Sequence, residues 1–168
     1  MNKHEGELNV DSLQVHSLRL TIELVPSTCF YSNVRSMVSK ENWDEIRKAC
    51  YSLAGYNCEI CGGRGDKWPV ECHEVWSYDD VNKVQKLEYL IALCPSCHMV
   101  KHFGFARING NEENALKHLM AVNGLSRTVA SKVVAAAFRI WEERSNYQWK
   151  VDLSYLDEIG VSYTLDRK

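Results

Sequence analysis

The sequence lacks a long hydrophobic run, a surplus of positive charge and an apolar leader. A transmembrane helix needs about 20 consecutive apolar residues, and no stretch approaches that length, so we expect no contact with a membrane. The formal net charge is −2, whereas proteins that depend on non-specific DNA binding carry a basic surplus. Any contact with nucleic acid is therefore expected to be local, transient or assisted by a partner.

The chain also lacks internal repeats and low-complexity linkers. Its N-terminus, "MNKHEGELNVDS", is polar and has no signal-peptide core, which predicts a cytoplasmic protein. A length of 168 residues suits one globular domain with a real core. We therefore predict a single domain over 1–168, with a metal-bearing centre at about 55–105 and a helical extension at about 112–145.

Cysteine is what the chain has in abundance, with seven in all. Four of them form two CxxC pairs, "CEIC" at Cys58 and Cys61 and "CPSC" at Cys94 and Cys97. In a reducing compartment this spacing indicates metal ligands rather than disulfides. Four soft thiolates suit tetrahedral Zn(II), so the sequence predicts one structural zinc site. Of the three remaining cysteines, Cys29 and Cys50 stand among apolar residues and are interpreted as buried small hydrophobes.

The hydrophobic pattern predicts an α+β fold. "LRLTIELVP" alternates like a half-buried strand, and Ser39 can cap a helix that runs to about Leu53. "VECHEVW" is expected to be extended, and a short helix is expected from Pro95 to about Phe103. The region from about Glu112 to Ser145 reads as two helices broken at "NGLS", followed by a closing strand at "YQWKVDL" and a helical turn at "SYLDEIG". The predicted architecture is a metal-bearing centre flanked by an N-terminal strand and helix and a C-terminal helical hairpin.

Further potential ligands surround the second CxxC pair. His98 and His102 stand four residues apart, so a helix would place both imidazoles on one face, able to hold one ion. Cys72 and His73 are adjacent on the extended segment, where neighbouring side chains point to opposite faces. One of them could ligate while the other faces a substrate. A metal-assisted phosphodiesterase needs such an arrangement, with a divalent ion to stabilise charge and a neutral imidazole to accept a proton.

The order CxxC, a histidine on a strand, then CxxC-H-x3-H resembles the HNH, or His-Me finger, endonucleases. The resemblance implies a treble-clef-like ββα-metal finger with a four-cysteine zinc site. It also implies hydrolysis of DNA phosphodiester bonds with a second divalent cation (Mg, Mn or Zn). Carried onto this chain, it makes His73 the general base and His98 a catalytic metal ligand, with Cys72 and His102 completing the ligand set. The implied partner is nucleic acid, most simply DNA.

The chain departs from the family pattern at two positions. Cys72 stands where the family prefers Asp or His, and a thiolate binds Zn(II) readily but is a poor ligand for Mg(II). The family also carries an Asn shortly before the second CxxC, where this chain offers Glu88 and Tyr89 and places Asn82 further away. These departures keep a non-catalytic zinc-finger module, binding nucleic acid or a protein, as the main alternative.

A zinc nucleobase deaminase is a second alternative, because "CHE" followed by "CPSC" resembles its ligand pattern. That reading would place zinc on Cys72, Cys94 and Cys97 and would leave Cys58 and Cys61 unexplained. The C-terminal helices could form a homodimer contact or bind a protein partner. His118 carries no pattern in the sequence.

Overall fold

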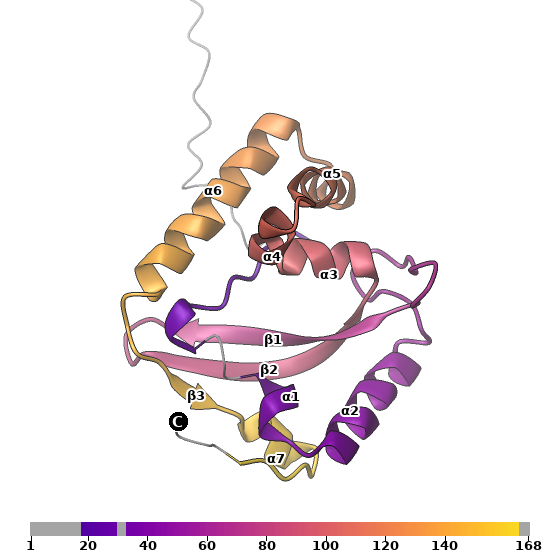
Figure 1. Ribbon diagram of the computed structural model, residues 1–168, viewed down its shortest axis with the longest axis vertical. Helices are drawn as coiled ribbons and strands as arrows, with labels where there is room; N and C mark the ends of the chain where they lie inside the picture. Colours follow the sequence, from indigo (N-terminus) through magenta and orange to yellow (C-terminus); the bar gives the residue numbers. More distant parts are fainter. Residues whose placement is uncertain (1–17, 30–32, 165–168) are drawn as a thin grey trace, which may run out of the picture.

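The computed structural model describes residues 18–29 and 33–164, and it has the predicted α+β character (Figure 1). Two long strands, β1 (Glu71–Asp79) and β2 (Val84–Leu93), form an antiparallel hairpin. A short strand, β3 (Lys150–Asp152), pairs in parallel with β2, which gives the sheet order β1-β2-β3. Among the described residues, no helix is long and apolar enough to cross a membrane.

Helices cover both faces of the hairpin (Figure 1). On one side lie α3 (Pro95–Lys101), α4 (Phe103–Ile108), α5 (Glu112–Asn123) and α6 (Arg127–Arg144). On the other lie α1 (Val34–Met37), α2 (Lys40–Leu53) and α7 (Ser154–Glu158), and a 3-10 turn, η3 (Ser27–Cys29), precedes α1. The hairpin therefore has a layer of helices on each face, and alternate side chains of its strands point into one layer or the other.

The helix boundaries follow the capping residues in the sequence. Ser39 accepts a hydrogen bond from the backbone N–H of Asn42 and begins α2. Gly124 ends α5 with φ of 65°, a left-handed conformation that favours glycine, and Ser126 caps α6. The predicted helical hairpin is thus present. The helix expected from Pro95 to Phe103 is instead divided into α3 and α4 at His102, whose ψ is 46°.

The strand predicted at "LRLTIELVP" is wrong, although this segment is extended and half-buried as its alternation indicated. Other partners satisfy its backbone. The side chain of Asn123 bonds both the N–H and the C=O of Leu20, and the N–H of Glu23 donates to the C=O of Lys101. Alternation predicts burial on one side, but it does not distinguish a strand from an extended chain that is held by helices.

The main core lies between the hairpin and the C-terminal helices. Its buried residues include Leu93, Phe103, Leu119 and Val134, together with three of the four CxxC cysteines. A second cluster on the other face joins Leu87 to Val34, Leu153 and Leu156. In this core α5 packs against α3, and α6 packs against α5, so the C-terminal hairpin supports the region that carries the predicted ligands.

Candidate metal centres

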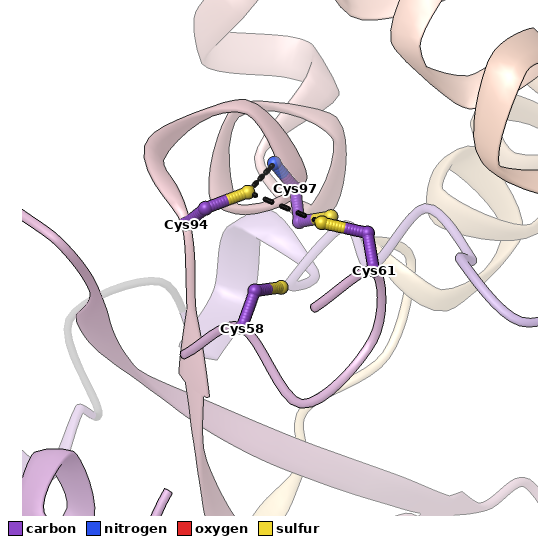
Figure 2. Close-up of side chains that lie close together, drawn as sticks. All are labelled: Cys58, Cys61, Cys94 and Cys97. Carbon is purple, nitrogen blue, oxygen red and sulfur yellow. Dashed lines mark hydrogen bonds between the residues drawn. The ribbon is translucent and has the colours of Figure 1, made fainter. Parts of the chain in front are cut away.

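The four CxxC cysteines converge at the junction between β2 and α3 (Figure 2). Cys58 and Cys61 come from the loop between α2 and β1, Cys94 is the N-cap of α3, and Cys97 lies in the first turn of that helix. The four sulfur atoms lie within 4.8 Å of one another. Figure 2 shows the side chains directed toward a common centre. The group can hold a metal ion such as zinc, as the spacing predicted.

The local backbone explains why these residues form a tight knuckle. Gly62 has φ of 76°, and its N–H donates to the C=O of Cys58, which closes the turn between the first pair. A Cβ atom on Gly65 would lie 2.3 Å from the C=O oxygen of Trp68, so this position requires glycine. The N–H groups of Gly63 and Cys97 point at the sulfurs of Cys61 and Cys94, at 3.4 and 3.5 Å. Such donors stabilise thiolates, the form that binds zinc.

A histidine that the sequence pattern did not mark also contacts this site. His118, on α5, places Nε2 3.2 Å from the sulfur of Cys97. If Nε2 carries the proton, His118 donates a hydrogen bond to the Cys97 thiolate and withdraws charge from it. His118 stands alone in the sequence, 21 residues after Cys97, so no spacing rule would have found it. The contact links the C-terminal helical hairpin directly to the cysteine site.

Three histidines form a second group on the side of the hairpin that faces α3. His73 of β1 is buried, His98 of α3 is half-buried and His102 at the end of α3 is exposed. One ring nitrogen from each lies within 4.8 Å of the others. The ring centroids are 5.2 Å apart for His73 and His98, 4.9 Å for His73 and His102, and 4.6 Å for His98 and His102. The structure therefore brings together three of the four residues that the sequence assigned to the catalytic site.

Carboxylates orient two of these three imidazoles. Nδ1 of His98 lies 2.6 Å from Oε2 of Glu71, and Nε2 of His73 lies 3.0 Å from Oε2 of Glu23. An ionised carboxylate only accepts, so each of these ring nitrogens is the protonated donor. The lone pair is then left on Nε2 of His98 and on Nδ1 of His73. Imidazoles that ligate metals are commonly held in this way by a carboxylate on the other ring nitrogen.

The spacing of the nitrogens suits a shared ion. Nε2 of His98 lies 3.1 Å from Nε2 of His102. Two nitrogens on one tetrahedral zinc, each at 2.0–2.1 Å, lie about 3.3 Å apart. The three residues present thus fit a divalent transition-metal ion, with one ring nitrogen from each as a donor.

The surroundings of His73 and His102 favour the neutral, ligating form of these two imidazoles. Burial lowers the pKa of His73, against the opposing effect of Glu23. Desolvation by the surrounding protein, followed by repulsion from His98 and His73, lowers the pKa of His102 to about 3, although the residue is exposed. Burial disfavours the charge on Glu23, but hydrogen bonds from His73 and Lys101 hold its pKa below the ordinary value. Neutral imidazoles beside charged carboxylates are the protonation states that a metal site requires.

Cys72 does not lie with the three histidines, so the prediction that it would ligate their metal ion is wrong. It points to the opposite face of β1, where it packs with Cys50, Val70 and Ala92. The neighbouring Cys50 thiol, together with burial, raises the pKa of Cys72 above the ordinary value. A thiol that stays protonated is a poor ligand. The same placement argues against the deaminase reading, because Cys94 and Cys97 group with Cys58 and Cys61 instead of Cys72.

The alternation of side chains along β1 determines which of its residues reach the histidine site. His73 and Glu71, two apart, both face α3, whereas Cys72 and Glu74 face the other layer. Glu71 could have been found in the sequence from this alternation. Glu23 could not, since it lies 50 residues before His73 and belongs to no motif.

The residues that stand near the expected family Asn have other roles. Asn82 donates to the side chain of Asp79 within the turn between β1 and β2, and Glu88 accepts a hydrogen bond from Ser77. Neither is in the histidine group.

Comparisons with protein-family models, curated proteins and solved structures found no match to this chain. The resemblance to HNH endonucleases therefore rests on the motifs alone, and the function must be argued from the geometry of the two sites.

Proposed function

We propose that this protein is a metal-dependent nuclease that hydrolyses DNA phosphodiester bonds. In this proposal the four-cysteine site holds a structural zinc, and His73, His98 and His102 hold a second divalent ion. The observation that carries the proposal is the histidine group itself. One nitrogen from each of the three imidazoles converges with the others, and carboxylates orient the rings of His73 and His98. The group is accessible from solvent because His102 is exposed. Since the free thiols suit a reducing compartment, we place this activity in the cytoplasm.

The order of the elements supports a treble-clef ββα-metal finger. A cysteine knuckle leads into the β1–β2 hairpin, and α3 begins at the second cysteine pair. The histidines come from the first strand and from the helix, which are the two elements that carry the catalytic metal in the HNH family.

His73 receives a different role from the one that the sequence suggested. The motif assigned it to proton transfer as a general base. However, its Nε2 is engaged by Glu23, and its ring belongs to the group formed with His98 and His102. The geometry fits a third ligand better than a base facing substrate, and we propose that role. Glu23 and Glu71 are then positioning residues that hold the tautomers of His73 and His98.

The chemistry of the proposed site follows from three neutral donors. A divalent ion, when bound, supplies Lewis-acid stabilisation of phosphate charge and makes bound water more acidic. The protein contributes neutral imidazoles, which leave the positive charge of the ion uncompensated toward the substrate. Lys101 is paired with Glu23 and buried, so it stabilises the carboxylate that orients His73.

Cleavage assays with matched variants test the proposal. Zinc-loaded protein is incubated with supercoiled plasmid, single-stranded DNA and RNA in the presence of added Mg(II), Mn(II) or Zn(II). We expect metal-dependent cleavage of DNA that His98→Asn abolishes or shifts to much higher metal concentration. Lys132→Gln serves as the control, because it changes an exposed residue of α6 that belongs to neither metal group. If the wild type cleaves none of these substrates with any of the metals, the nuclease proposal is refuted and the non-catalytic zinc-module reading replaces it.

A further inference from the structure

Two cysteines outside both metal groups meet on the face of β1 opposite the histidines. Cys50 lies in the last turn of α2, and Cys72 lies near the start of β1. The two residues pack in one apolar cluster with Val70 and Ala92, at the contact between α2 and β1. Cys50 is 9% exposed, and Cys72 is partly exposed. Both are free thiols and neither belongs to a metal group, so this pair is available for chemistry that the proposed nuclease does not use.

We propose that Cys50 and Cys72 are a site of reversible disulfide formation driven by a peroxide-class oxidant. One thiol attacks an oxygen of hydrogen peroxide, the O–O bond breaks, and a sulfenic acid and one water are formed. The second thiol then attacks the sulfenic sulfur and loses its proton, and the second water leaves as the S–S bond forms. Two electrons pass from the sulfurs to the peroxide. Formation of the disulfide does not depend on the proposed nuclease activity, but its effect on metal release rests on the zinc proposed at the four cysteines.

The position of the pair gives the disulfide a structural consequence. The chain between Cys50 and Cys72 contains Cys58 and Cys61, the first half of the four-cysteine site. A bond between residues 50 and 72 would close this segment into a loop and join α2 covalently to β1. A closed loop has fewer unfolded conformations, so the first cysteine pair stays close to the second when the metal dissociates. The disulfide should therefore act as a clamp that slows loss of zinc.

The disulfide would not block the histidines, because it would form on the opposite face of β1. Cys72 lies between Glu71 and His73 in the sequence, but its side chain points away from both. The two residues already pack in one cluster, and α2 contacts β1 directly, so the bond needs only local movement of α2 against β1. The zinc thiolates are expected to be less reactive than this pair, because they are engaged by the metal and by backbone N–H groups.

Peroxide oxidation of the zinc-loaded protein tests the inference. Hydrogen peroxide is added in small molar excess, and free thiols are alkylated under denaturing conditions with a chelator. Peptide mapping should show a Cys50–Cys72 disulfide, a loss of two free thiols and retention of zinc. The oxidised protein should then release zinc to a chelator severalfold more slowly than the reduced protein, and a dithiol reductant should restore the original rate.

Variants of single cysteines supply the controls. Cys50→Ser and Cys72→Ser should both abolish the disulfide and the slower release. Cys50→Ala, which suits a buried apolar position, repeats the test if the serine variant fails to fold. Cys29→Ser removes a different buried thiol and should behave as wild type. The inference is overturned if peroxide oxidises the zinc cysteines and expels the metal while Cys50 and Cys72 stay reduced. It is also overturned if the disulfide forms but zinc release is unchanged.

Discussion

Glu74 should make the free energy of unfolding fall as pH rises, and this effect can be measured. Its carboxyl is on the face of β1 away from the histidines and accepts a hydrogen bond of 2.7 Å from the N–H of Val34. Burial raises its pKa to about 7, against the opposing effect of the Val34 N–H. In the unfolded chain the pKa returns to its ordinary value near 4.5. The folded state therefore holds the Glu74 proton more tightly than the unfolded state.

The direction of the effect follows from linkage. A carboxyl with a raised pKa contributes stability that is fully present below the unfolded value of 4.5 and is lost as pH rises through 7. The whole loss is about 3 kcal/mol, and about 2 kcal/mol of it falls between pH 5.5 and 8.5. Glu74→Gln keeps an oxygen that can accept from Val34 and removes the titration. The variant should thus gain about 2 kcal/mol relative to wild type over this pH interval.

Denaturant unfolding of both proteins at several pH values gives the difference directly. Effects of pH on the zinc thiolates are common to the two proteins and cancel. Glu88→Gln, on the neighbouring strand, controls for the loss of one negative charge in the hairpin. The free energy of unfolding of Glu74→Gln minus that of the wild type should rise with pH. A value that stays constant with pH, or that grows toward low pH, would refute the buried placement of Glu74.

Three further perturbations test the two sites. Cys97→Ser should lose the zinc and unfold or aggregate, because metal binding to a closed thiolate site is coupled to folding; elemental analysis and circular dichroism check this, and a zinc-free variant that melts like wild type would contradict the assignment. His118→Phe keeps the ring volume but removes the hydrogen bond to Cys97, and we expect zinc to dissociate about tenfold faster into a chelator, whereas an unchanged rate would show that the contact is only packing. Glu71→Gln should weaken binding of the second metal by about tenfold, since the amide holds the His98 tautomer less firmly than a carboxylate; calorimetry with Mn(II) measures this, and equal affinity would rule out an orienting role.

The sequence predicted those parts of the structure that depend on local chemistry. The CxxC spacing predicted the four-cysteine group, and Ser39, Gly124 and Ser126 predicted helix ends. The i, i+4 spacing of His98 and His102 placed both rings together, since α3 begins just before them. Each of these features depends on a few neighbouring residues.

Features that depend on packing between distant segments could not be predicted in the same way. Adjacent residues of β1 were expected to face opposite layers, but the sequence did not show that His73 would join the other histidines and that Cys72 would meet Cys50. That choice is made by α2 and α3, which cover the two faces of the hairpin. Glu23 reaches His73 because the extended N-terminal segment is held by Asn123 and Lys101, and alternation alone suggested a strand there.

The most direct test of the account is to locate the second metal. Crystals of zinc-loaded protein are soaked in Mn(II), and anomalous scattering distinguishes the two elements. We predict zinc at the four cysteines and manganese between Nδ1 of His73 and the Nε2 atoms of His98 and His102. The double variant His98→Asn/His102→Asn should keep the zinc and lose the manganese. A wild-type map with no manganese among the three histidines, at a concentration that saturates calorimetric binding, would contradict the central claim.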